Sequence, residues 1–197
     1  MRNHGRQVLA ALALTLVSVA PAAAQGMAKD GMAMEKGTTM VGGQAMYRTK
    51  DIVDNAVNSA DHTTLVAAVK AAGLVETLKG AGPFTVFAPT NAAFAQLPEG
   101  TVSTLLQPEN KDQLTKVLTY HVVAGAYDVN ALMKAIKSGH GEATLKTVSG
   151  GWLTFTMNGD RNIVVRDAKG GVANISTYDV RQSNGVIQVI DRVLLPS

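Results

Sequence analysis

The sequence predicts an α+β domain whose sheet is mostly antiparallel. Apolar residues recur at helical spacing from Thr49 to about Lys137, and after Gly141 they alternate with polar residues at the period of a strand. Helices followed by strands along the chain are typical of α+β domains. A chain of 197 residues has room for one such domain, and the pattern requires no second one.

The first 24 residues have the pattern of an export signal. Two arginines precede an apolar stretch at residues 8–20, after which Pro21 is followed by three alanines. A membrane-spanning helix needs about 20 apolar residues, so this stretch is too short for a stable membrane anchor. The chain also has no cysteine to carry a lipid. We therefore expect Sec-type cleavage near Ala24 and a secreted or periplasmic protein.

Residues 25–46 are predicted to form a flexible tether ahead of a domain at residues 47–197. The segment holds five of the eight methionines of the chain and few other large apolar residues, so it cannot bury enough surface to offset its ordering entropy. Thioethers are soft ligands, which makes Met32 and Met34 candidates for Cu(I). The tether is thus either a copper-handling segment or a solvated linker that binds nothing.

Cap residues and glycines indicate where the helices begin and end. Asp61 or Thr63 is expected to cap a helix that Gly73 ends. Asp128 is expected to cap a later helix. The side chains of that later helix predicted to face inward are Leu132, Met133 and Ile136.

Strands are predicted where the helical period fails. Residues 84–88 are apolar on both faces and follow a Gly-Pro pair, which is typical of a central strand. Residues 120–123 are a second candidate. Later strands are separated by turns at Asn158-Gly159 and at 169–171. Asn184-Gly185 is expected to begin a long apolar strand at 186–195.

The domain lacks the sequence patterns of common active sites. Its three histidines, His62, His121 and His140, have no metal-ligand spacing, and no nucleophile elbow, phosphate loop or dinucleotide pattern occurs. From Tyr47 onward, 14 basic residues face 13 acidic ones, which disfavours binding to nucleic acid. We therefore predict a non-catalytic domain. An unrecognised polymer hydrolase is kept as an alternative.

Three segments resemble the fasciclin domain family. Residues 84–94 (FTVFAPTNAAF) resemble its first signature box, Tyr120-His121 its central pair, and residues 184–196 (NGVIQVIDRVLLP) its second box, in the order and spacing of the family. The second box often has histidine where this chain has Gln188. The expected structural signature residues are Phe84, Phe87, Pro89, Thr90, Asn91, Phe94, Tyr120, His121, Asn184 and Gly185.

The resemblance implies a wedge-shaped β-sandwich flanked by helices. It also implies a cell-surface or matrix adhesion module without a cofactor, whose partner is an envelope or extracellular protein or polysaccharide. From the residues themselves, the boxes are expected to supply core and turn positions, with Thr90 or Asn91 capping the helix that carries Phe94. His121 is either a buried, hydrogen-bonded core residue or a pH-sensitive contact.

An aspartate-isoleucine pair before the second box is implicated in receptor binding by animal members of the family. The matching positions here are Asp179-Val180, so the resemblance implies a partner-binding segment there, together with Tyr178 and Arg181. An acidic side chain beside an aliphatic one suits the rim of a recognition surface. The alternative is that Asp179 is solvated and Val180 packs in the sheet.

Overall fold

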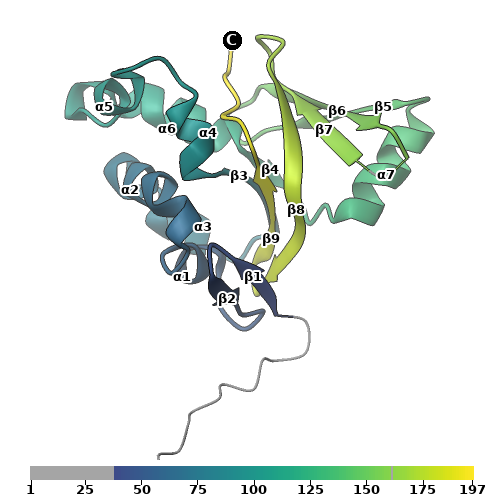
Figure 1. The fold of residues 1–197 in the computed structure, drawn as a ribbon, viewed down its shortest axis with the longest axis horizontal. Helices are drawn as coiled ribbons and strands as arrows, with labels where there is room; N and C mark the ends of the chain where they lie inside the picture. The colour runs from purple at the N-terminus through teal and green to yellow at the C-terminus, as the bar shows by residue number, and fades with distance from the viewer. Residues whose placement is uncertain (1–37, 161) are drawn as a thin grey trace, which may run out of the picture. The chain divides into compact units, whose positions relative to one another are not determined.

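Short helices occupy the first part of the described chain and strands most of the second (Figure 1). The computed structural model describes residues 38–160 and 162–197. The helices are α1 (Ile52–Ala56), α2 (Thr63–Ala72), α3 (Val75–Lys79), α4 (Asn91–Ala95), α5 (Thr101–Leu105), α6 (Lys111–Tyr120) and α7 (Val129–Ser138). The strands are β1 (Thr39–Val41), β2 (Gln44–Met46), β3 (Phe84–Pro89), β4 (Val122–Ala124), β5 (Glu142–Lys146), β6 (Trp152–Asn158), β7 (Asn162–Arg166), β8 (Val172–Gln182) and β9 (Gly185–Ile190).

Seven strands form one sheet in the order β4-β3-β9-β8-β7-β6-β5. Among the strands of the described residues, only β3 and β9 pair in parallel, so the prediction of a mostly antiparallel sheet is confirmed. The parallel pair places the two signature boxes side by side, with Phe87 opposite Gln188. A bridge between Val123 and Thr147 connects β4 to the residue after β5, so the sheet curls back on itself.

Two clusters of buried side chains cover different parts of this sheet. The first core lies where α1–α6 pack on β3 and β9, and it includes Ile52, Leu65, Val69, Leu78, Val86, Phe94, Leu118 and Ile187. The second core lies between α7 and the inner faces of β5–β8, with Phe87 contributed from β3. Its members include Phe87, Tyr120, Leu132, Ile136, Leu153, Phe155, Ile163, Val165 and Ile190. The helices of the two cores lie on opposite sides of the central strands in Figure 1.

Side-chain caps fix several helix starts, although not all of them as expected. Asp128 caps α7, since its Oδ1 accepts from the Ala131 N–H at 2.9 Å. The predicted caps of α2 are wrong, because neither Asp61 nor Thr63 makes a side-chain cap there. Asn91 takes this role from outside the helix and accepts from the Thr64 N–H at 3.0 Å.

Three other expectations are corrected by the structure. Residues 39–46 form a β1-β2 hairpin rather than part of a flexible tether, because Val41 and Met46 are buried in the first core. Strand β9 ends at Ile190 instead of continuing to residue 195. Met133 is 36% exposed and does not face inward with Leu132 and Ile136. The predicted signal and residues 25–37 of the predicted tether lie outside the described residues.

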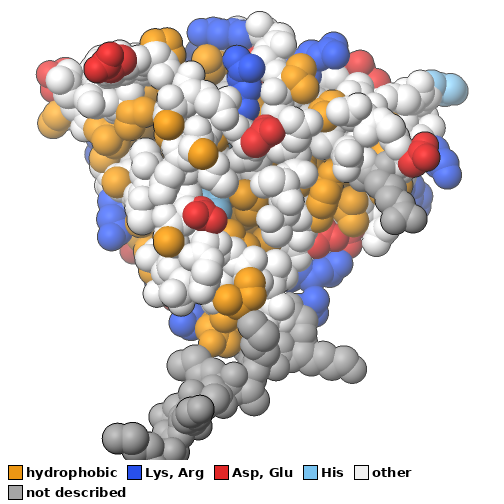
Figure 2. Space-filling view, in the orientation of Figure 1, with side chains coloured by type: hydrophobic (Ala, Val, Ile, Leu, Met, Phe, Trp, Pro, Cys, Tyr) orange, Lys and Arg blue, Asp and Glu red, His pale blue; other side chains and the backbone are white. Residues whose placement is uncertain are grey.

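Charges of both signs are distributed over the surface. Lys and Arg are interspersed with Asp and Glu on the face shown in Figure 2. That face therefore has no continuous basic stripe of the kind that binds a nucleic-acid backbone. In residues 38–160 and 162–197, no helix combines the length and the apolar character needed to cross a bilayer.

Candidate functional site

The predicted partner-binding segment is an irregular stretch of β8. Its register against β9 shifts on either side of Thr177, and Asp179 has a positive φ of 55°. The Asp179 carboxylate accepts hydrogen bonds from the Val129 N–H at 2.8 Å and from the Gln188 side chain at 2.9 Å. Asp179 therefore holds the start of α7 against β9, rather than standing free in solvent.

The neighbouring side chains of this segment also make contacts within the domain. The Tyr178 hydroxyl accepts from the Ile163 N–H at 3.0 Å, and the Arg181 guanidinium pairs with Asp128 at 2.8 Å. Val180 is only 1% exposed and belongs to the first core, so the expectation that it touches a partner is wrong. The bulge turns this side chain inward. Partner contact by Tyr178, Asp179 and Arg181 stays a prediction.

Tyr120 joins the helical part of the chain to two strands. Its ring is fully buried, and its hydroxyl donates to the Trp152 carbonyl at 2.7 Å while accepting from the Ala168 N–H at 2.9 Å. Burial raises the pKa of this phenol. The hydroxyl therefore stays protonated at neutral pH and serves as a donor within the fold.

His121 is held as a neutral ring by two backbone groups. Its Nδ1 donates to the Val117 carbonyl at 2.8 Å, and its Nε2 accepts from the Leu194 N–H at 2.9 Å. A second ring proton would oppose the Leu194 donor. Burial is the main cause that lowers the pKa of His121 to about 4, against smaller opposing effects from the Val117 carbonyl and Asp167. This environment suits a structural histidine.

The remaining signature residues join elements that are distant in sequence. Thr90 caps α4 through the Ala93 N–H at 3.2 Å, while Asn91 contacts the start of α2. The buried Asn184 side chain accepts from the Ile52 N–H at 3.1 Å and donates to the carbonyls of Leu78 and Gly80. A Cβ on Gly185 would collide with the Phe84 carbonyl, so only glycine fits there.

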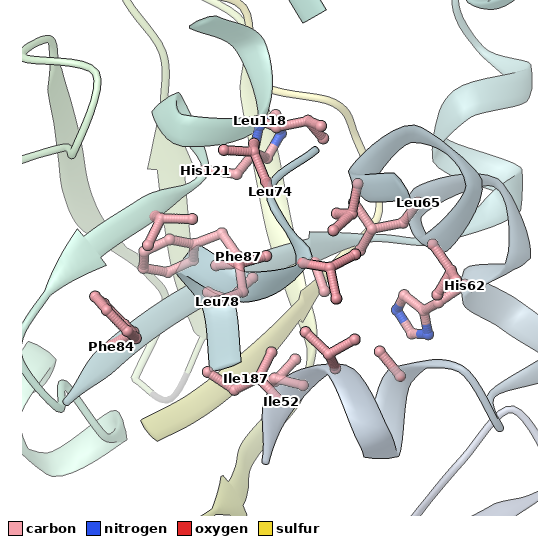
Figure 3. Close-up of a pocket in the computed structure, with 18 of the residues that line it drawn as sticks. Ile52, His62, Leu65, Leu74, Leu78, Phe84, Phe87, Leu118, His121 and Ile187 are labelled. Carbon is pink, nitrogen blue, oxygen red and sulfur yellow. The ribbon is translucent and has the colours of Figure 1, made fainter. Parts of the chain in front are cut away.

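An apolar cavity of about 70 Å³ lies in the first core, between helices α1–α3 and the sheet (Figure 3). Its walls come from the β1-β2 hairpin, from these helices and from strands β3 and β9. The lining includes Met46, Ile52, His62, Leu65, Leu78 and Ile187. An engineered apolar cavity of about 150 Å³ binds benzene. This smaller cavity has room for a small apolar group or a few water molecules.

His62 is one of the polar residues that line this cavity. The side chain is 3% exposed, and its Nδ1 lies 2.9 Å from the Ser59 hydroxyl. Its Nε2 has no hydrogen-bond partner among the described residues. Burial lowers the pKa of His62, although the nearby Ala88 carbonyl and Asp61 act in the opposite direction. The ring is therefore neutral at physiological pH.

Sequence reasoning missed three residues in the strand-rich second half of the described chain. Gln188 is fully buried and bonds both to Asp179 and to the Tyr127 carbonyl. Asp167 accepts from three backbone N–H groups, including that of Leu195 at 2.9 Å. Trp152 is 56% exposed at the start of β6. Of the three, only Trp152 could have been recognised from the sequence, since it is the one tryptophan in the chain and begins an alternating strand.

The structure groups no metal ligands within its described part. Residues 38–160 and 162–197 contain no cluster of three or more His, Cys, Asp or Glu side chains that could hold an ion. Met32 and Met34 lie outside the described residues, so the copper alternative stays a prediction.

Comparisons with known proteins agree with this arrangement. The model of the Fasciclin domain matches residues 60–196. Protein sll1483 of Synechocystis is 50% identical over 147 residues, which cover 74% of this chain and 73% of that protein. Immunogenic protein MPB70 of Mycobacterium bovis is 34% identical over 198 residues, covering 95% and 92%.

A solved structure shares the fold. A FAS1 domain pair from the insect cell adhesion molecule Fasciclin I superimposes with a TM-score of 0.66 at 18% sequence identity, over 74% of this chain and 51% of that one. The expected fold, an α+β fasciclin-like arrangement of mostly antiparallel strands flanked by helices, is thereby confirmed. With the match of the family model over residues 60–196, the chain belongs to the fasciclin domain family.

Proposed function

We propose that this protein is a non-catalytic binding module that acts in the periplasm or after secretion and attaches to an envelope or extracellular partner. The export-type pattern of residues 1–24 supports the location. Membership of the fasciclin family supports the module, and the solved relative belongs to a molecule described as a cell adhesion molecule. We carry that role over to this chain as part of the proposal.

One observation carries the binding role, namely the exposure of Trp152. An indole is a large apolar group, and leaving Trp152 56% exposed forgoes burial energy that a core position would recover. Tryptophan is also enriched among the residues that dominate binding energy at interfaces. The polar side chains of the signature boxes, by contrast, are occupied by backbone hydrogen bonds. Surface recognition is therefore the function that this geometry supports best.

A fractionation and retention experiment tests the proposal. Cells that produce the full chain are separated into cytoplasm, periplasm, envelope and medium, and the protein in each is N-terminally sequenced. We expect a mature form beginning near Gln25 outside the cytoplasm. The purified protein should then be retained by washed envelopes or by polymers concentrated from the medium.

Matched variants show which surface is used. Trp152→Ala should reduce retention, whereas Met133→Ala removes another exposed apolar side chain, from α7, and should leave retention unchanged. Finding only unprocessed chain in the cytoplasm, or no retention by any fraction, would overturn the proposal.

A further inference from the structure

Trp152 lies on the outer face of strands β5–β8, where Thr144, Lys146 and Arg166 are also exposed. In this face Lys146 lies directly opposite Trp152 on β5. Thr154, two residues further along β6, lies between Thr144 and Arg166. Directly paired side chains have Cβ atoms about 5 Å apart, and diagonal neighbours lie about 7–8 Å apart, within reach of long side chains. Trp152 is therefore surrounded on this face by two cations and two hydroxyls.

The backbone that carries the indole is held by hydrogen bonds and close packing. Its carbonyl is held by the Tyr120 hydroxyl, which also holds the Ala168 N–H of the adjoining segment. Gly151 packs so closely that an added Cβ would lie 2.7 Å from the Tyr120 ring. The Gly151 carbonyl is bonded in turn by the Thr147 N–H at 2.8 Å. Because the backbone here is fixed by folding, the backbone adds little ordering cost to binding.

The charge near the indole has one sign. Lys146 and Arg166 are its charged neighbours in the paired rows, and the exposed Lys169 follows in the turn after β7. The nearby Asp167 carboxylate is 7% exposed and satisfied by backbone donors, so it faces away from this surface. Glu142 lies two rows away from Trp152, opposite Thr156. This arrangement complements an anion placed over the indole.

The shape and polarity of the face narrow the class of partner. Stable protein interfaces usually have an apolar central area of several side chains. Here polar side chains surround the indole, and the exposed apolar Val172 lies beyond Arg166, on β8. A pyranose ring suits this surface, since its C–H face stacks on an aromatic ring and its hydroxyls can bond with threonines. A carboxylate on the sugar would pair with the arginine fork and the lysine.

We infer that the Trp152 face, defined as Trp152, Lys146, Thr144, Thr154 and Arg166, binds carboxylate-bearing polysaccharide. The inference rests on the proposed function and names its partner class. It assigns to Tyr120 a positioning role, because this signature tyrosine fixes the strand end that presents the indole.

The single tryptophan gives a direct assay. Protein purified from cells that express the full chain is titrated with polygalacturonate, with neutral dextran and with polyglutamate, while its tryptophan emission is recorded. Polygalacturonate should change the emission saturably and less strongly at high salt, and dextran should leave it unchanged. Polyglutamate should bind at least about tenfold more weakly, because it offers charge without a sugar face.

Variants then locate the site by affinity electrophoresis, which needs no tryptophan. Trp152→Ala should weaken polygalacturonate binding by about tenfold or more, and Lys146→Ala and Arg166→Ala by about three- to tenfold each. Lys137→Ala, an exposed cation on α7, should bind like the wild type. Because the Trp152 side chain is exposed, the urea midpoint of the Trp152→Ala variant should equal that of the wild type. An unchanged midpoint separates loss of binding from loss of fold.

The outcomes separate this inference from the proposed function. Equal binding of polyglutamate, or wild-type binding by Trp152→Ala, would overturn the polysaccharide assignment. If polygalacturonate fails to bind while envelopes still retain the protein, the partner class is wrong and the binding module stands. If neither binds, both fail.

Discussion

The two cores of this domain are packed differently, although they share one sheet. The second core sets α7 against alternating strands, and its central side chains, such as Leu153, Phe155 and Val165, have no exposed surface. The first core sets several five-residue helices against β3 and β9 and keeps an apolar cavity with an unsatisfied histidine nitrogen. Helices this short depend on tertiary contacts rather than on their own stability. The core whose central side chains are fully buried is therefore the one that supports the Trp152 face.

Truncating one leucine in each core should give the largest difference. Leu153→Ala should lower the free energy of unfolding by about 4–5 kcal/mol, because it opens a new cavity in a filled core. Leu65→Ala should cost about 2–3 kcal/mol, since Leu65 already borders a cavity and has fewer contacts to lose. Urea denaturation of both variants measures the two losses in the free energy of unfolding. Equal losses would show that the cavity does not weaken the first core.

Acid should act through the two buried histidines. The pKa of His121 is about 4 in the folded state, below the ordinary 6.5, so the unfolded chain binds its proton first as the pH falls. The neutral ring therefore makes its full contribution to stability above about pH 6.5. Between about pH 6.5 and 4, the free energy of unfolding should fall by about 3 kcal/mol. Unfolding free energies measured across this range should show the decline.

A His121→Gln variant provides the control, because glutamine keeps a donor and an acceptor but does not titrate. Its decline between pH 6.5 and 4 should be shallower than that of the wild type. His62, whose pKa is also lowered by burial, would contribute to the slope that remains. An unchanged slope in the variant would assign the acid sensitivity to other groups.

Adding one methylene to each core should give the smallest effects, with opposite signs. Val86 lines the cavity, and Val86→Ile should stabilise the fold by about 0.8 kcal/mol if the new group enters that space. Val165 is fully buried in the second core, and Val165→Ile should destabilise by about 1 kcal/mol through overpacking. Thermal unfolding of both proteins tests the signs, and stabilisation by both would mean that the two cores have similar free volume.

Sequence reasoning succeeded where the signal was local. The apolar run of β3 and the Asp128 cap were readable because each depends on a few adjacent residues. It failed where a distant partner decides the outcome. Asn91 accepts from the N–H of Thr64, which lies 27 residues earlier in the first turn of α2, and no residue near Thr64 indicates this contact.

The candidate site was harder to read than the fold. Strict alternation cannot tell which way Val180 points, because the two register shifts in β8 change the facing of the residues that follow. The bonds between Gln188 and Asp179 depend on that same bulge. Trp152 was visible in the sequence, but its exposure follows from which face of the sheet α7 covers.

The position of β9 bears on how the chain folds. This strand is the last in the sequence, yet it lies between β3 and β8 and is the link between the two parts of the sheet. Its contacts with β3 close a loop of about 100 residues. Such distant pairings form slowly, because the chain loses loop-closure entropy before the new contacts stabilise the fold. The helices and the β5–β7 meander can form from nearby segments. The sheet as a whole can assemble only once the final strand is available, so refolding should end with one late, cooperative step.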